Sequence, residues 1–394
     1  MITLEALPDH ATTSKPHVLD LCSITREARE TPPICRARTS DGGHAWLVTR
    51  HEYAKKLLQD DRLRKDPAPD ENKADSDKPD LLKILMRDDY HDEAGSEQEQ
   101  ANARKLIHPQ LAPRRVLNLR PRMEALVEEM LDALVSKGAA ADLHADFSVP
   151  FVRTALGEVL GIPPADREWS VEMISRAANL GDPESASAAA ETFAGFLHEL
   201  MASRRTDPGD DLLSRVSVSD QENVVTKVMV VMVAGFASMV TQIDTGFLLF
   251  ATHPEQREAL ARDPGLLPKA ADEVLRTTGS LMLPRFARQD VEIGGVTIPA
   301  NEMMLLDLTL ANFDDEAFDR PERFDITRSP NPHLSFGHGP WTCTGAALAR
   351  VQLQAIFGGL FDRLPTVHPA GPLDQLRKSA DEFIGGIDDL LVSW

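Results

Sequence analysis

The chain has 394 residues and a formal net charge of −20 at pH 7, so it can bury a large core and lacks the basic balance of a nucleic-acid-binding protein. Its three cysteines, Cys22, Cys35 and Cys343, are too few for a disulfide framework, and we therefore expect a protein of the reducing cytoplasm. The first ten residues contain neither a basic leader nor an apolar core, so we expect no signal peptide and no membrane anchor.

The N-terminal region is expected to contain a short β region and one helix. Residues 1–30 are interpreted as a loosely ordered leading segment, and 31–394, which contains no Ser/Gly linker and no repeat, as a single domain. Two extended runs between Ile34 and Val48 flank a Gly-Gly pair and predict a β-hairpin. A helix is expected over 51–59. The following 65–80 segment is crowded with Asp, Lys and Pro, which predicts a solvated loop.

Helices are expected to dominate the middle of the chain, because apolar residues recur there at helical spacing. The expected helices are 98–108, 122–137, 147–160, 166–180 and 187–203. The two at 122–137 and 147–160 carry no chemical signature and are interpreted as framework.

A longer helix is expected from about 220 to 251. Ser219, followed three residues later by Glu222, is a capping box at its start, and His253 with the next proline ends it. No charged residue lies between Val228 and Ile243, which predicts burial on all sides. This run is shorter than the about 20 apolar residues of a membrane span and contains Gly, Ser, Thr and Gln, so a core-spanning helix is the better interpretation.

Another helix is expected to begin at Asp263-Pro264 and to end at about Thr278. Glu273 and Arg276 lie three residues apart on one face of it, so their side chains can form an ion pair. By itself such a pair is usually an exposed surface feature.

The most informative segment is Phe336 to Gly345, Phe-Gly-His-Gly-Pro-Trp-Thr-Cys-Thr-Gly. Its three glycines and one proline predict a tight loop. Helix-forming residues begin at Ala346, so Cys343 lies just before a helix N-terminus. A helix N-terminus and nearby backbone N–H groups favour a thiolate over a thiol. An anionic sulfur on a glycine loop suits axial ligation of heme iron, whereas a lone cysteine in ordinary surroundings is more often a small buried apolar residue.

The pattern Phe-Gly-x-Gly-x-x-x-Cys-x-Gly resembles the heme-binding signature of the cytochrome P450 family. The fixed positions beside the cysteine are Phe336, Gly337, Gly339 and Gly345. The resemblance extends over about 34–394 and implies a mainly α protein with a minor β region, in the triangular helical fold that surrounds a central long helix. It also implies one b-type heme whose iron is bound by the Cys343 thiolate.

The resemblance further implies residues that hold the heme and its loop. Arg104 and Arg285 fall where family arginines bind heme propionates, and His333 occupies a position that contacts a propionate in some members. Ala234 lies where the central helix passes close to the heme face. For each of the two positions Arg285 and His333, an ordinary surface residue is about equally plausible.

Two of the implied propionate positions depart from the family pattern. Gln100 stands where a histidine is usual, although an amide can still donate a hydrogen bond. Trp341 stands where many bacterial relatives carry a histidine or arginine, and an indole cannot form that ion pair. We therefore expect Arg104, Arg285 and His333 to carry more of the propionate binding.

Glu273 and Arg276 match the family's structural Glu-x-x-Arg, and Arg323, in Pro-Glu-Arg-Phe, is expected to complete a triad. These three residues are expected to hold the cysteine loop and to take no part in catalysis.

The long helix departs from the family pattern where protons reach the iron-bound oxygen. The family has Ala-Gly-x-acid-Thr, and this chain has Ala-Gly-Phe-Ala-Ser. Gly235 fits, while Ala237 stands at the acid position and Ser238 at the alcohol. Splitting the oxygen–oxygen bond needs protons, which we expect to come through Ser238, ordered water, Thr241 or a polar group of the substrate. Alternatively, Ala237 is simply tolerated, and Asp244 or solvent serves as the relay.

The substrate pocket is expected on less patterned segments, and the helices at 166–180 and 187–203 resemble the family's mobile lid. The expected pocket residues are Met86, Val233, Phe236, Ala237, Ser280, Leu281, Met282 and Ile384. The expected partners are a small-molecule substrate, a ferredoxin and its reductase, which passes electrons from NAD(P)H. A monomer is expected, with no nucleic-acid or membrane partner. Lys105, Arg114, Arg115 and Arg350 are candidates for a basic patch that binds an acidic ferredoxin, although scattered cations are usually solvated surface.

Two classes of function follow, and a third is least favoured. The first is a heme-thiolate oxidoreductase of bacterial specialised metabolism that uses O2 to oxidise a small organic substrate. Its reaction is either conventional C–H hydroxylation or radical C–C or C–N coupling of an aromatic peptide-like compound, towards which the missing acid at Ala237 points. The second is a heme accessory protein that does not turn over. The third is a helical interaction protein with a coincidental glycine loop.

Overall fold

The computed structural model describes residues 3–4, 20–39, 43–65, 101–138, 140–179, 182–221, 223–279, 282–378 and 386–394. The described chain forms two compact units, each assembled from separated stretches. The first comprises Met1–Ala68, Thr245–Ala346 and Pro372–Arg377, and the second comprises Pro69–Asp244, Ala347–Gly371 and Lys378–Trp394. Neither unit is a continuous stretch of sequence, so the division does not test the prediction of a single domain over 31–394.

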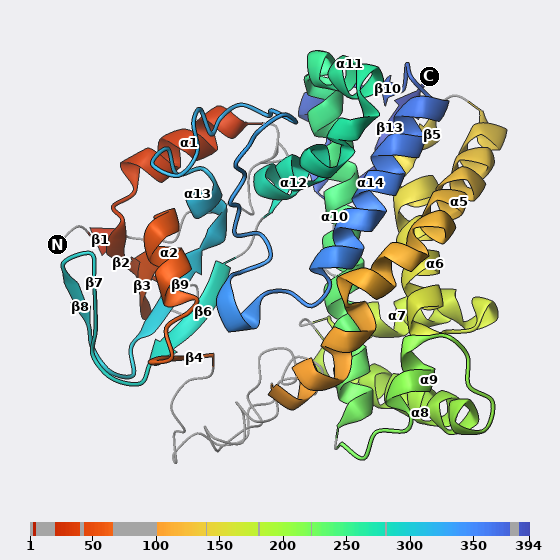
Figure 1. Ribbon diagram of the computed structural model, residues 1–394, viewed down its shortest axis with the longest axis horizontal. Helices are drawn as coiled ribbons and strands as arrows, with labels where there is room; N and C mark the ends of the chain where they lie inside the picture. The colour runs from red at the N-terminus through yellow and green to blue at the C-terminus, as the bar shows by residue number, and fades with distance from the viewer. Residues whose placement is uncertain are drawn as a thin grey trace. The chain divides into compact units, whose positions relative to one another are not determined.

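A six-stranded sheet lies in the first unit, in the order β1-β2-β3-β9-β6-β4 (Figure 1). The strands are β1 (Thr3–Leu4), β2 (Ile34–Arg38), β3 (His44–Val48), β4 (Leu63–Arg64), β6 (Met282–Ala287) and β9 (Met303–Asp307). Strands β2 and β3 are antiparallel, as the predicted hairpin requires. Strands β3 and β9, distant in sequence, pair in parallel with Trp46 opposite Met304. A separate hairpin joins β7 (Val291–Ile293) to β8 (Val296–Ile298).

Both faces of this sheet are buried. Trp46 and Val48 of β3 belong to one apolar cluster, while Ala45 and Leu47 belong to another. Successive side chains of a strand point to opposite faces, so this alternation places one cluster on each face. The sheet is therefore a buried scaffold.

The helices of the first unit are α1 (Leu21–Glu30), α2 (His51–Leu57), α11 (Pro254–Arg262), α12 (Leu267–Thr278) and α13 (Leu308–Asn312), with 3-10 turns η5 (Pro264–Leu266), η6 (Gly339–Trp341) and η7 (Leu373–Gln375). The interpretation of residues 1–30 as loosely ordered was wrong for α1. Asp20 caps this helix, because its carboxylate accepts the Ser23 backbone N–H at 3.1 Å. Ile24 and Ala28, four residues apart, are each 1% exposed, so one face of α1 packs on the core.

The second unit is built mainly of helices, which run from orange to green, with α14 in blue, in Figure 1. They are a helix over 101–107, η2 (His108–Leu111), α5 (Pro113–Lys137), the π-helix η3 (His144–Ser148), α6 (Val149–Leu160), η4 (Pro164–Asp166), α7 (Arg167–Ala177), α8 (Pro183–Thr206), α9 (Leu212–Val216), most of α10 (Val224–Thr252) and α14 (Ala346–Arg363). The short strands are β5 (Ala141–Asp142), β10 (His368–Pro369), β12 (Ile387–Asp388) and β13 (Leu391–Ser393), and β11 is Arg377–Lys378. Strands β10, β13 and β5 form one sheet in that order.

Some helices begin at other positions than predicted, and α8, for example, begins at Pro183 and not at residue 187. Helix α5 begins at Pro113 and not at residue 122, because proline is favoured at the first helical turn and Pro121 is accommodated inside the helix. Helix α10 begins at Val224 and not at residue 220. The Gln221 backbone N–H donates to Ser219 Oγ at 3.2 Å, and Asn223 adopts a left-handed φ of 56°, so the chain turns before the helix starts. Glu222 lies outside the described residues.

Helix α10 is the long central helix that the sequence predicts. Among the described helices it is long and apolar enough to cross a membrane by length and composition alone, and 56% of its most apolar window is buried inside the protein. A core helix passes the same test, and this burial favours the core-helix interpretation.

Candidate functional site

The cysteine loop, Phe336–Gly345, closes tightly just before α14. The Cys343 backbone N–H donates to the Phe336 carbonyl at 2.8 Å, and Gly337 and Gly339 adopt φ of 68° and 72°. Such angles favour glycine. The Cys343 side chain is exposed, and α14 begins three residues later, at Ala346. The predicted placement of this cysteine before a helix N-terminus is therefore confirmed.

Gly339 allows the loop to pack against the end of α2. A Cβ at this position would lie 2.7 Å from Gln59 Cγ and 3.2 Å from the Leu58 carbonyl oxygen, closer than side chains normally approach. The Thr342 hydroxyl donates to the Gly339 carbonyl at 2.8 Å. The loop is thus held both by its own hydrogen bonds and by packing within the first unit.

A buried ionic cluster, here called the Glu273 network, lies in the same unit. Glu273 and Arg276 are fully buried, and Arg276 forms a two-point ion pair with the carboxylate at 2.9 and 2.8 Å. Arg328 Nε lies 3.1 Å from Glu273 Oε2, and the Asn331 amide donates to the same oxygen at 3.0 Å. A buried carboxylate needs this many partners because its desolvation is costly.

Arg323 takes a different place from the one predicted. Its carbonyl oxygen accepts from Arg276 Nη2 at 3.1 Å, while its side chain is exposed. Arg328 supplies the second guanidinium beside Glu273. The prediction of an Arg323 side chain in the triad is corrected accordingly, and sequence reasoning missed both Arg328 and Asn331.

Hydrogen bonds connect the Glu273 network to the residues directly before the cysteine loop. Arg276 Nη1 donates to the Asn312 carbonyl at 3.0 Å. The Asn312 side chain in turn accepts the Leu334 backbone N–H at 2.7 Å and donates to Ser335 Oγ at 3.0 Å. The loop begins at residue 336, so these hydrogen bonds connect the buried ion pair to the backbone that leads into the loop.

Three basic residues lie in the loop, lie just before it in the sequence or were predicted to bind a heme propionate. The His333 side chain is 3% exposed, its Nε2 lies 3.3 Å from Asp272 Oδ1, and its ring centroid lies 5.8 Å from that of Phe336. Arg285, on β6, is buried, and its Nη1 donates to the Pro284 carbonyl at 2.7 Å.

Burial, and then the neighbouring charges of Lys55 and His51, lower the pKa of His338, so this loop imidazole is neutral at pH 7.

In the second unit, small and hydroxyl side chains form a stripe along α10. Ala234 and Ser238 are exposed and Thr241 is half-buried, and these residues lie at helical spacing on one face. The Ser238 hydroxyl donates to the Ala234 carbonyl at 2.7 Å. Val233 and Phe236 are 9% and 1% exposed, so the structure does not bring these two predicted pocket residues onto the stripe.

Comparisons with known proteins identify the family. The family model described as Cytochrome P450 matches residues 265–377. The chain is 32% identical to pentalenolactone synthase of Streptomyces exfoliatus, over 96% of this chain and 97% of that protein. It is 34% identical to mycinamicin IV hydroxylase/epoxidase of Micromonospora griseorubida, over 96% of each. The chain belongs to the cytochrome P450 family.

Solved P450 structures confirm the predicted fold. The substrate-free cytochrome P450 PimD, a pimaricin epoxidase, matches with a TM-score of 0.83 and 37% identity, over 100% of this chain and 99% of that one. SgvP, described as a putative thioether synthase in the tailoring of griseoviridin, matches with a TM-score of 0.83 and 30% identity over 100% of both chains. The chain is thus a bacterial P450 monooxygenase of the kind that tailors secondary metabolites, and its family implies heme-thiolate iron, a small-molecule substrate and redox partners.

The donors of this P450 fit a heme. The cysteine loop presents an exposed sulfur, the soft anionic ligand that heme iron accepts. Within the described residues, no group of three or more His, Cys, Asp or Glu side chains gathers as a metal site of another kind. One thiolate is the protein ligand that the iron of such a heme requires.

Several predicted site residues lie outside the described part of this P450: Gln100, Met86, Ser280, Leu281 and Ile384. The Trp341 side chain is likewise not described. Arg104 is half-buried on the helix over 101–107, and Met282 opens β6 opposite Asp307.

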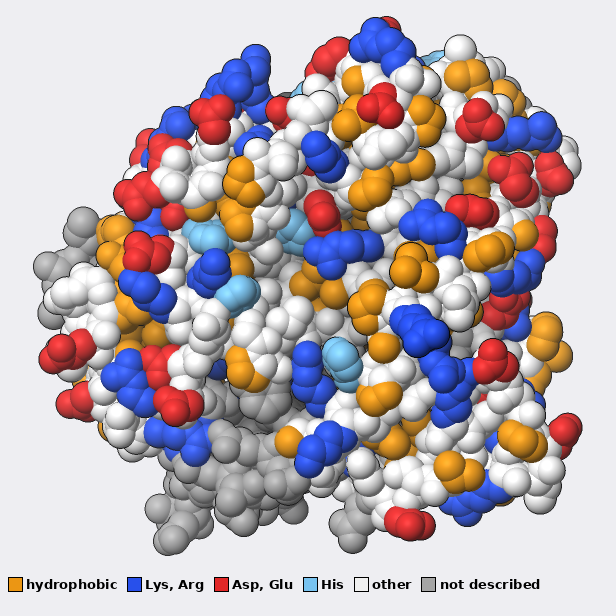
Figure 2. Space-filling view, in the orientation of Figure 1, with side chains coloured by type: hydrophobic (Ala, Val, Ile, Leu, Met, Phe, Trp, Pro, Cys, Tyr) orange, Lys and Arg blue, Asp and Glu red, His pale blue; other side chains and the backbone are white. Residues whose placement is uncertain are grey.

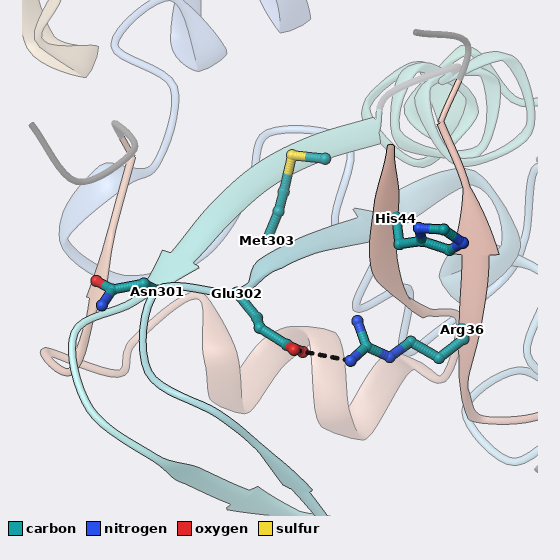
Figure 3. A pocket seen from close by; sticks show the side chains of 5 residues that line it. All are labelled: Arg36, His44, Asn301, Glu302 and Met303. Carbon is teal, nitrogen blue, oxygen red and sulfur yellow. Dashed lines mark hydrogen bonds and ion pairs between the residues drawn. The ribbon is translucent and has the colours of Figure 1, made fainter. Parts of the chain in front are cut away.

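A surface hollow in the first unit is not a catalytic candidate. Figure 3 shows its lining, Arg36, His44, Asn301, Glu302 and Met303, with Glu302 turned towards Arg36. Arg36 Nη2 lies 2.7 Å from Glu302 Oε1, and its guanidinium stacks 4.4 Å above the Trp46 ring. The Trp46 indole N–H also donates to Glu302. These groups satisfy one another across the neighbouring interior strands β2, β3 and β9.

Sequence reasoning also missed a buried cluster in the second unit, formed by His144, Ser148 and Asp244. One signal was available, because Asp244 is the only acid in α10 and a carboxylate in a buried helix must find donors. The identity of those donors could not be obtained from local spacing.

Proposed function

We propose that this P450 oxidises a small-molecule natural product by inserting oxygen, with electrons that pass from NAD(P)H through a ferredoxin reductase and a ferredoxin. The observation that carries the proposal is the cysteine loop, with its exposed sulfur and its buried brace. The relatives named as a mycinamicin IV hydroxylase/epoxidase and a pimaricin epoxidase support oxygen insertion as the reaction class.

Heme, when bound, supplies the activation of O2, and the chain holds it in place. Cys343 would provide the thiolate ligand, and Gly337 and Gly339 would allow the loop to approach a flat ring. Arg104 and Arg285 are the proposed partners of the propionates, since a guanidinium binds a carboxylate through two N–H groups. His333 contributes less, because Asp272 already lies beside its ring.

Proton delivery is proposed to use hydroxyl groups and water in place of a carboxylate at residue 237. The Ser238 hydroxyl hydrogen is directed to the Ala234 carbonyl, so its oxygen remains able to accept a hydrogen bond from a water molecule. The Thr241 hydroxyl oxygen accepts the Gly386 backbone N–H at 3.1 Å. Small side chains at Ala234, Gly235 and Ala237 leave room for such water on α10.

Radical coupling is the second candidate, and Ala237 favours it. A substrate that carries its own N–H or O–H groups, such as an aromatic peptide-like compound, would supply protons in place of an enzyme carboxylate. Two of its centres would each lose a hydrogen and bond to one another, while O2, with two electrons from NAD(P)H and two protons, would be converted to water. Incubation of the reconstituted enzyme with substrate and labelled dioxygen separates the two reactions. Label in the product supports insertion, and coupled product without label supports the second candidate.

The proposed ferredoxin surface lies on the second unit. Lys105 and Arg114 are exposed, on the helix over 101–107 and on α5. Arg350 is half-buried on α14, and Arg115 lies 3.8 Å from the exposed Asp210. Figure 2 shows Lys and Arg side chains spread over the face that bears α5 and α14 in Figure 1. Such a surface favours an acidic partner through its charge. We also propose a monomer that acts in the cytoplasm.

The first test is the absorbance of the reduced protein with carbon monoxide. The proposal predicts the red-shifted Soret band of thiolate ligation, followed by substrate turnover with a surrogate ferredoxin and reductase. A band at the position of an ordinary heme protein would contradict the assignment of Cys343. A thiolate band without turnover of any of a panel of natural products would favour the accessory heme protein.

A further inference from the structure

A buried carboxylate joins three segments of the second unit. Asp244, on α10, is 0% exposed. The Ser148 hydroxyl donates to its Oδ1 at 2.5 Å, and His144 Nδ1 lies 2.7 Å from its Oδ2. The Ile387 backbone N–H donates to Oδ2 at 3.2 Å. Because a buried carboxylate without donors is costly, these contacts define where the π-helix η3 and strand β12 lie along α10.

A second hydrogen bond lies one helical turn earlier. Thr241 is three residues before Asp244, so both side chains lie on the same face of α10. The Thr241 hydroxyl accepts the Gly386 backbone N–H at 3.1 Å. Two successive backbone N–H groups, of residues 386 and 387, are therefore held by two side chains of α10. We call this arrangement the C-terminal clamp.

Gly386 shows how closely the backbone approaches the carboxylate. A Cβ at this position would lie 2.3 Å from Asp244 Oδ2 and 2.9 Å from His144 Nδ1, and the φ of Gly386 is 84°. Both the space and the backbone conformation require glycine. The clamp leaves no room for the strand to move nearer to α10.

We infer that Asp244 is a positioning residue which, with Thr241, fixes the backbone of residues 386 and 387 on α10 and thereby determines which ligands fit beside the Ala234, Ser238 and Thr241 stripe. Thr241 belongs both to the clamp and to that stripe. The inference rests on the proposed heme-thiolate function.

The test compares ligands of different size on the heme-loaded full chain. Imidazole, 4-phenylimidazole and clotrimazole each bind heme iron through nitrogen and shift the Soret band. Only the two larger ligands are large enough for their affinity to depend on the residues around the iron. In Asp244→Asn, Thr241→Val and Gly386→Ala we expect the affinity for clotrimazole to fall by about tenfold, the effect of losing about one hydrogen bond of the clamp. We expect the affinity for imidazole to change by less than about twofold.

Hydrogen exchange supplies a readout that is independent of heme. The amides of residues 386 and 387 are expected to exchange faster in Asp244→Asn and Gly386→Ala than in the wild type. Gly386→Ala breaks the clamp while Asp244 remains, so the inference stays testable if Asp244→Asn fails to fold. Asp307→Asn is the matched control, because Asp307 is a 1% exposed carboxylate in the first unit that accepts the Leu310 N–H.

The outcomes separate the inference from the proposed function. A wild type without a thiolate-type carbon monoxide band would overturn the proposed function, and the exchange rates would still test the clamp. A normal band with an unchanged ratio of clotrimazole to imidazole affinity in all three variants would overturn the inference. So would unchanged exchange at residues 386 and 387, or an equal change of the ratio in Asp307→Asn.

Discussion

Two fully buried carboxylates, Glu273 in the first unit and Asp244 in the second, are stabilised in different ways. Glu273 has two guanidinium partners, Arg276 and Arg328, so permanent opposite charges surround it. Asp244 has a hydroxyl, an imidazole and a backbone N–H. The first arrangement places guanidinium groups, which stay protonated in proteins, beside its carboxylate, whereas the second includes a histidine, the side chain that titrates near neutrality.

The difference teaches what each carboxylate does. The Glu273 network braces the backbone before the cysteine loop, where a ligand to iron must not move. The Asp244 carboxylate holds a strand through fewer and weaker hydrogen bonds, a looser attachment that suits the side of a site where ligands differ. Four predictions test this contrast.

Replacing the sulfur should have the largest effect. In Cys343→Ala we expect complete loss of the thiolate-type carbon monoxide band and of turnover, because the change removes the proposed thiolate ligand. The spectrum of the reduced protein checks this result. Cys22→Ala, which removes another exposed cysteine on α1, should leave the band in place. Retention of the band in Cys343→Ala would refute the ligand assignment.

Glu273→Gln should be the most destabilising change away from the sulfur. It leaves the buried guanidinium of Arg276 and the partly buried one of Arg328 without a counter-charge, which typically costs about 3–5 kcal/mol of unfolding free energy. Asp244→Asn should cost less, about 1–3 kcal/mol, since its donors are largely neutral. Urea unfolding of the apoprotein measures both.

The exposed pair of Asp132 with Arg363, 3.1 Å apart, provides the control for these two variants. Asp132→Asn should barely change the unfolding free energy, because exposed ion pairs contribute little. Equal costs for Glu273→Gln and Asp244→Asn would remove the contrast between the two clusters.

Variants of Arg323 and Arg328 test which of the two arginines stabilises the buried Glu273 carboxylate. Arg328→Ala should lower the unfolding free energy by about 2 kcal/mol, because it removes a charged donor from the buried carboxylate. Arg323→Ala should change it by less than about 0.5 kcal/mol, since the Arg323 contact uses the backbone carbonyl. The same measurement of unfolding free energy tests this prediction. A larger cost for Arg323→Ala than for Arg328→Ala would support the triad that the sequence pattern suggests.

The smallest expected effect is the dependence of stability on pH through His144. Burial lowers the pKa of His144, but the hydrogen bond and charge of Asp244, with the charges of Asp142 and Asp388, outweigh this, and the pKa is raised above 6.5. A raised pKa in the folded state means that the contribution is fully present below pH 6.5 and is lost as the pH rises through the folded value.

Unfolding experiments across that range check the sign. The wild type should lose stability, relative to His144→Gln, as the pH rises above 6.5. Glutamine can still donate to Asp244 but does not titrate. The stability of the Arg328→Ala variant relative to the wild type should not vary over the same interval, because arginine stays charged. Parallel pH profiles for the wild type and His144→Gln would show that this pair does not titrate as described.

The sequence by itself determined the family, the cysteine loop and the central helix. These features are local: glycine spacing around Cys343, a charge-free run in α10, and Glu273 three residues before Arg276. Local spacing is sufficient because loop conformation, helix burial and an ion pair within one helix depend on neighbours in the chain. The same local reasoning missed α1, although its buried residues recur at helical spacing: Leu21, Ile24, Thr25 and Ala28.

Only the tertiary structure decided which arginine reaches Glu273 and which side chains hold Asp244. Arg328 lies 55 positions from Glu273, and His144 lies 100 positions from Asp244. Contacts at such separations depend on how helices and loops pack, and packing is set by burial and shape over the whole unit, which no local pattern records. The residues that carry the chemistry therefore lie in short sequence motifs, whereas the residues that hold them in place come from distant parts of the chain.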